Sequence, residues 1–263
     1  MKYLYFLIVF ILLFSSCTVY QDFHFNKDGS GHLDVLLDAS SLIQLSQMYS
    51  LRPDTVKKDK YEDMILKSLD KIYLDLKIEM VDIIPDSIKQ KIDNIDELRG
   101  VSIVFFNNKS DSKVGLRYVF ESIENLDRKL DRFHEISKFF DNPDSTGSRK
   151  LAMLYGNVND YNKTSYSKQI KFKKGKVIIL PVVDNKNKME DEEPDFDSQQ
   201  MMNSMVSVQT RIFLPGKVKK SKSKDYQIID DNVVVLNDGK VGVINSKDKE
   251  IKIKYKRAWW DIF

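Results

Sequence analysis

Cysteine is nearly absent from this chain, because Cys17 is the only one among 263 residues. A single cysteine allows no intrachain disulfide and no cysteine-rich metal site. The sequence also lacks the G-x-S-x-G, P-loop, G-x-G-x-x-G and H-E-x-x-H signatures, so it offers no recognisable nucleophile, phosphate cradle or zinc-protease helix. From these absences we expect no enzymatic activity, no catalytic residues and no cofactor.

A strong excess of charge is missing as well. Lys plus Arg number 42 and Asp plus Glu number 39. Nucleic-acid-binding proteins usually concentrate positive charge and read bases with arginine forks, so we expect no nucleic-acid partner. Hydrophobic residues make up 42% and charged residues 31% of the chain, a balance typical of a globular protein with a substantial core.

The first seventeen residues form the most informative segment. Lys2 precedes an apolar run from Tyr3 to Phe14, which is followed by Ser15, Ser16 and Cys17. The run is shorter than the about 20 apolar residues of a transmembrane helix. A positive start, a short apolar stretch and small residues at its end are typical of an export signal. The alternatives to a lipid-bearing cysteine are a plain secretory signal with a chance cysteine, and an uncleaved anchor.

The position of Cys17 resembles the cleavage site of bacterial lipoproteins. The resemblance implies removal of residues 1–16 and attachment of a diacylglycerol to the Cys17 thiol, with palmitate among the acyl chains. Such a chain is anchored to the membrane and does not span it. Thr18 stands where an inner-membrane retention signal often has Asp, so the resemblance implies the outer membrane.

Hydrophobic periodicity predicts the elements of the mature chain, residues 17–263. Alternation on both sides of Asn26 to Gly31 predicts a β-hairpin. Helical spacing predicts helices at 38–50, 61–80, 85–100 and 124–139. Strands are predicted at 101–106, 114–121, 166–172, 176–183, 206–213, 226–229, 233–236 and 251–255, and a solvated acidic loop near 184–198. We therefore expect a single α+β domain, a largely antiparallel β-sheet with several amphipathic helices packed on one face and concentrated in the N-terminal half.

Three turn-containing segments together resemble a known group of proteins. They are Phe25 to Gly31 before an alternating strand, Tyr118 to Leu126 leading from strand to helix, and Phe213 to Val218 ending in a Pro-Gly turn. Their order behind a lipoprotein signal resembles the LppM-like bacterial lipoproteins and related uncharacterised envelope lipoproteins. The resemblance covers residues 19–256. It implies an α+β domain at a membrane surface that binds lipid or glycolipid, and it supplies no catalytic residues.

The predicted hairpin contains two candidate metal sites. Residues 26–37 have the start of an EF-hand calcium loop, but Leu37 replaces the bidentate Glu, so a hairpin turn is favoured. His24 and His32 lie on the two arms, flanked by Asp22 and Asp34, and two histidines with a carboxylate can hold zinc. Alternating polar residues on a hairpin usually face solvent, so we expect solvent-facing histidines and no metal.

The aromatic C-terminal tail is the remaining candidate contact. Trp259, Trp260 and Phe263 suit a membrane interface or a partner protein, although a tail that covers the core is equally ordinary. The favoured function is a membrane-anchored, non-enzymatic binding module for lipid or glycolipid. The alternatives are a scaffold that docks another envelope protein through its surface or this tail, and a hydrolase that would require converging carboxylates or a Ser-His pair.

Overall fold

The computed structural model describes residues 18–38, 76–84, 86–90, 94–108, 111–140, 165–181, 207–219, 224–236, 244 and 249–256. Several predictions lie outside these described residues: the signal at 1–16, Cys17, the helix at 38–50 beyond Asp38, the acidic loop near 184–198, and Trp259, Trp260 and Phe263. Within the described ranges, no helix is both long enough and apolar enough to cross a membrane.

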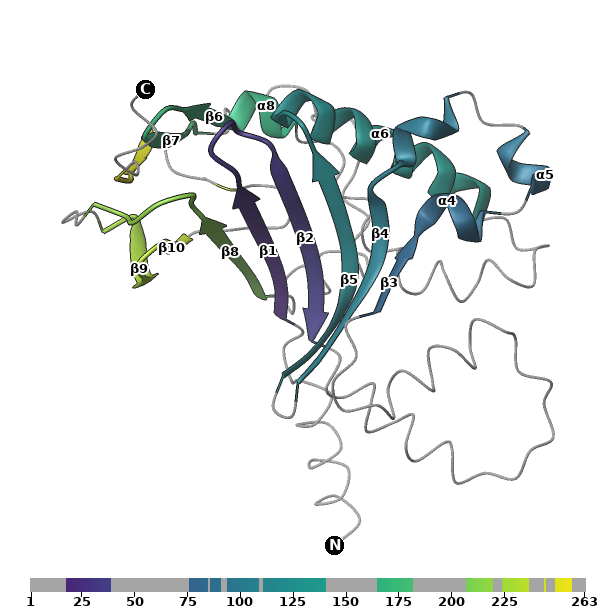
Figure 1. Cartoon of the computed structure of the whole chain (residues 1–263), viewed down its shortest axis with the longest axis horizontal. Helices are drawn as coiled ribbons and strands as arrows, with labels where there is room; N and C mark the ends of the chain where they lie inside the picture. The colour runs from purple at the N-terminus through teal and green to yellow at the C-terminus, as the bar shows by residue number, and fades with distance from the viewer. Residues whose placement is uncertain are drawn as a thin grey trace, which may run out of the picture.

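An eight-stranded sheet dominates the molecule, in the order β3-β4-β5-β2-β1-β8-β10-β9 (Figure 1). Neighbouring strands are antiparallel except for β1 and β8, which run parallel. The strands are β1 (Thr18–Phe25), β2 (Gly31–Asp38), β3 (Leu76–Glu79), β4 (Val101–Asn108), β5 (Asp111–Phe120), β8 (Ser207–Phe213), β9 (Tyr226–Asp230) and β10 (Val233–Leu236).

A smaller sheet and the helices complete the described structure. The three-stranded sheet has the order β11-β7-β6, formed by Ile251–Lys254, Lys176–Ile179 and Ile170–Lys173. The helices are α4 (Met80–Ile83), α5 (Asp86–Lys89), the 3-10 turn η1 (Ile95–Leu98), α6 (Ile123–Phe140) and α8 (Tyr166–Gln169). Figure 1 shows α6 and α8 running along the end of the sheet where β1 turns into β2.

The predicted hairpin is confirmed as β1 and β2, which pair from Val19 with Leu37 to Phe25 with Gly31. Its turn is closed by Asp28, whose Oδ1 accepts hydrogen bonds from the backbone N–H of Ser30 at 3.0 Å and from its hydroxyl at 2.7 Å. Gly29 has a φ of 93°, a conformation that residues with a Cβ rarely adopt. The structure therefore supports the turn interpretation of residues 26–31, with the Asp28 carboxylate engaged in the turn itself.

The main core lies between the eight-stranded sheet and α6. Side chains from alternate strand positions, among them Phe23, Leu33 and Tyr118, are fully buried in one cluster with Leu126 and Phe133 of α6. The rings of Tyr118 and Phe133 meet edge to face at 6.0 Å. Because strand side chains alternate between faces, every second residue of these strands points to the opposite face of the sheet. That opposite face carries the candidate functional site.

The predicted fold class is wrong. Strands account for 52% of the described residues, and helices are not concentrated in the N-terminal half. The long helix α6 lies near the middle of the chain, and α8 lies in the second half. Residues 61–75 of the predicted helix at 61–80 lie outside the described residues. Its described end is the strand β3, where Leu76 and Ile78 alternate with Lys77 and Glu79 and pair with β4. Short turns, α5 and η1, occupy the described part of the predicted helix at 85–100.

Candidate functional site

Four charged residues form a row across adjacent strands on the face of the sheet opposite α6. In the order of the strands β5, β2, β1 and β8, this charged row is Arg117, Asp34, Asp22 and Arg211. Each residue is the direct register partner of the next. The row therefore follows from strand pairing alone, which brings together residues that are far apart in the sequence.

Each carboxylate in the charged row accepts a two-pronged hydrogen bond from one arginine. Arg117 donates from Nε to Asp34 Oδ1 and from Nη2 to Asp34 Oδ2, both at 2.7 Å. Arg211 donates from Nε to Asp22 Oδ1 at 2.6 Å and from Nη2 to Asp22 Oδ2. Paired, charge-assisted hydrogen bonds of this kind are the strong ones in proteins and fix both side chains in one geometry.

The two central carboxylates are buried side by side. Asp22 is 3% exposed and Asp34 is 2% exposed. Like charges directly opposite each other destabilise a sheet, so the arginine on the outer side of each carboxylate is needed to balance it. Burial raises the pKa of Asp22 above its usual 3.8, and Arg211 acts against that rise by hydrogen bonding and charge. Breaking one arginine contact would therefore leave an uncompensated charge in a buried position.

Two histidines form the next row of register partners. His24 pairs with His32 across the hairpin and with Phe213 of β8. The His24 ring is stacked between them, with its centroid 4.2 Å from that of His32 and 3.9 Å from that of Phe213. Burial lowers the pKa of both histidines from 6.5 to about 4, and Asp34 opposes that shift. Both imidazoles are therefore neutral at neutral pH.

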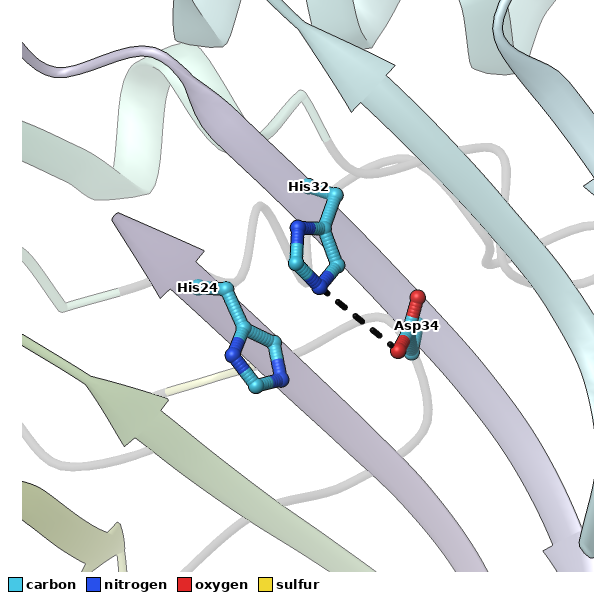
Figure 2. A group of neighbouring side chains, drawn as sticks. All are labelled: His24, His32 and Asp34. Carbon is cyan, nitrogen blue, oxygen red and sulfur yellow. Dashed lines mark ion pairs between the residues drawn. The ribbon is translucent and has the colours of Figure 1, made fainter. Parts of the chain in front are cut away.

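His24, His32 and Asp34 converge at the junction of the two rows. One ligand atom from each lies within 4.8 Å of the others. Figure 2 shows that both imidazoles turn a nitrogen toward Asp34, and that His32 Nε2 and Asp34 Oδ2 are 3.8 Å apart. Neutral imidazole nitrogens and a carboxylate oxygen are a known ligand set for zinc. Chemically, this cluster can hold a divalent metal ion or exchange protons with solvent.

No family model matches this chain, and no curated protein or solved structure matches it. The LppM-like resemblance therefore stays a prediction. The assignment of residues to the site rests on strand register, burial and hydrogen bonding.

The structure changes the sequence-based view of the hairpin. Alternation placed Asp22, His24, His32 and Asp34 on a solvent-facing side, but the two carboxylates are buried and the histidines are half-buried. The sequence showed no role for Arg117 and Arg211, whose only signal was their polar position within predicted strands. Cys17 and the tail residues Trp259, Trp260 and Phe263 lie outside the described residues, so their proposed roles stay predictions.

Proposed function

We propose that this chain is a bacterial envelope lipoprotein, anchored in the outer membrane by a lipid on Cys17, and that it acts as a binding module rather than as an enzyme. The observation that carries the anchor is that Thr18–Phe25, the residues that follow the cysteine in sequence, form the strand β1. β1 lies inside the sheet, between β2 and β8, and Thr18 itself pairs with Ser207. Cleavage before Cys17 leaves this inner strand intact, whereas cleavage further along would remove part of it.

Replacement of the proposed anchor residue tests this assignment. We expect Cys17→Ala to abolish incorporation of radiolabelled palmitate and to leave the chain at precursor mass, because the thiol that accepts the lipid is gone. Ser15→Ala is the control, since it keeps a small residue before the cysteine and should be labelled and processed as the native chain is. Equal labelling or equal processing of native and Cys17→Ala chains would show that Cys17 is not the anchor.

A lipid on Cys17 would hold the Thr18 end of the sheet at the membrane. β1 has eight residues and is roughly 26 Å long, at about 3.3 Å per residue. The β6–β7 hairpin lies at its other end, where Phe172 stacks on Phe25 at 5.2 Å. Dissolved salt screens the electrostatic attraction of a charged membrane, so at physiological ionic strength this attraction extends only about 8 Å from the surface. If β1 stands upright on the membrane, the hairpin lysines Lys171, Lys173, Lys174 and Lys176 lie beyond that range, and their expected role is to protect a sheet edge.

The lipid or glycolipid ligand is supported by two polar side chains on the core face of the sheet. Gln21 of β1 and Thr210 of β8 are register partners, and both are 0% exposed. Neither amide atom of Gln21 nor the hydroxyl of Thr210 has a hydrogen-bond partner among the described residues. Buried polar groups without partners are rare, and each one calls for an explanation such as an internal water, an ion or a bound molecule. Both side chains are enclosed by protein atoms, so a ligand with a polar head and an apolar body would reach them only after neighbouring core side chains move apart.

Lipid extraction tests the ligand. We expect the chain purified from membranes to carry an extractable lipid, detected by mass spectrometry, and Gln21→Leu to lower its amount severalfold because the headgroup loses two hydrogen-bonding atoms. The control is Gln227→Leu, which makes the same substitution at an exposed position of β9.

The absence of an extractable lipid would contradict the proposed ligand, and the stability of Gln21→Leu gives a second measurement. If no lipid is present, Gln21→Leu should stabilise the protein by about 1–3 kcal/mol, because it removes a buried unsatisfied amide. That outcome would exclude the ligand and leave the scaffold alternative.

The scaffold alternative is supported by β9, an edge strand in which Ile228 is 38% exposed and Ile229 is 56% exposed. Open strand edges are a common place for another chain to add.

A further inference from the structure

We propose that His24, His32 and Asp34 form a zinc-binding site on the face of the sheet opposite α6. This site goes beyond the proposed lipoprotein function, which requires no metal. Its three potential ligand atoms come from two neighbouring strands and already lie within 4.8 Å of one another. His24 and His32 are opposite each other in the hairpin, and Asp34 follows His32 by two positions on the same face.

The cluster must contract, and one ring must turn, before it can take up an ion. Zinc binds histidine nitrogen and carboxylate oxygen at about 2.0–2.2 Å, so tetrahedral ligand atoms are about 3.3 Å apart. His32 Nε2 and Asp34 Oδ2 are at 3.8 Å, close to that spacing. The imidazoles are stacked nearly parallel, with an angle of 11° between their planes. Because the lone pairs lie in the ring planes, at least one ring must tilt before both nitrogens reach one ion.

Asp34 can serve as a ligand while keeping its arginine contact. A carboxylate has about four lone-pair positions, and the two hydrogen bonds from Arg117 occupy only two of them. Metal-ligating carboxylates are commonly held by such outer hydrogen bonds, which orient them for the ion. The Arg117 charge also opposes a cation, so we infer weaker binding than in a closed four-ligand structural site.

The site is open to solvent and leaves one coordination position free. The His32 side chain is 30% exposed, which gives an ion access from outside. Three protein ligands leave the fourth tetrahedral position to water or to a group from a bound molecule. Two histidines with one carboxylate also suit other divalent transition metals. Zinc is the ion assigned here because it tolerates geometric distortion and needs no redox partner.

Zinc titration of the full chain in detergent tests the proposal. Every sample carries Cys17→Ala, so that the thiol cannot contribute. We expect one zinc per chain by competition with a chromophoric chelator. We expect His24→Asn and His32→Asn each to weaken binding by about a hundredfold or more, since even outer-shell partners contribute about 10–100-fold. The matched control is His134→Asn on α6, which should change the affinity by less than about twofold.

A second measurement uses chains that keep all three histidines, so its result does not depend on whether the histidine variants fold. The chain has three histidines, so nitrogen NMR of the rings can follow each of them. Zinc should shift the ring nitrogens of His24 and His32 and leave those of His134 unchanged. The proposal is overturned if no stoichiometric binding occurs, if the His24 and His32 signals stay in place, or if His134→Asn weakens binding as strongly as the site variants.

Discussion

Replacing Arg211 by Met is expected to lower the free energy of unfolding by about 3–5 kcal/mol, which is the usual effect of breaking a buried ion pair from one side. The variant leaves Asp22 without its arginine partner, 3% exposed and directly opposite Asp34. Stabilities of whole domains are only about 5–15 kcal/mol, so the loss should be visible as a large shift in a urea unfolding curve. The double variant Asp22→Asn with Arg211→Met removes both charges and should recover part of the loss.

A matched control separates burial from the ion pair as such. Arg99 and Asp96 also form an ion pair, with Nε and Oδ1 at 2.8 Å, but their side chains are 78% and 76% exposed. Arg99→Met should therefore change stability by less than about 1 kcal/mol. In Arg211→Met, the deficit should also shrink at acidic pH, because protonation of Asp22 removes the stranded charge. Equal effects of the two Arg→Met substitutions would contradict the role assigned to the charged row.

Hydrophobic periodicity was sufficient to predict the elements whose structure depends on residues close together in the sequence. The β1–β2 hairpin follows from alternation around the Asn26–Gly31 turn, and the predicted helix at 124–139 is confirmed as α6. The periodicity gave the wrong element at Leu76. This residue has the helical spacing to the apolar residues before it, and it also fits the alternation of the strand β3. Pairing with Phe105 of β4 selected the strand there. Tertiary contact of this kind overrides a weak local preference.

The candidate site could be predicted only in part. Alternation correctly placed His24 and His32 on facing arms of the hairpin and put Asp34 on their side. It could not show which strands lie on either side of the hairpin. Arg211 reaches Asp22 through the parallel pairing of β1 with β8, across 189 positions of sequence. That pairing turns an apparently solvent-facing stripe into a buried charged row, and no local signal reports it.

The largest pH effect should come from the two site histidines in metal-free protein, with a chelator present. Their pKa is about 4 in the folded chain and 6.5 without the fold, so the unfolded chain binds protons first as the pH falls. Stability should therefore be full above pH 6.5, decline between 6.5 and about 4, and level off below. At full strength each shift corresponds to about 3 kcal/mol. Partial exposure reduces this to roughly 1–2 kcal/mol per histidine.

Urea unfolding curves at steps from about pH 7 to about pH 4.5 test this decline. The double variant His24→Asn with His32→Asn should lose most of the slope, whereas His134→Asn should keep it. The contribution of Asp22 to the pH dependence of stability has the opposite sign, because its raised pKa adds stability as the pH falls toward 3.8. That contribution is present in all three chains, so it largely cancels when the variants are compared with the native protein. A slope that persists in the double variant would place the acid-sensitive groups outside the His24–His32 stack.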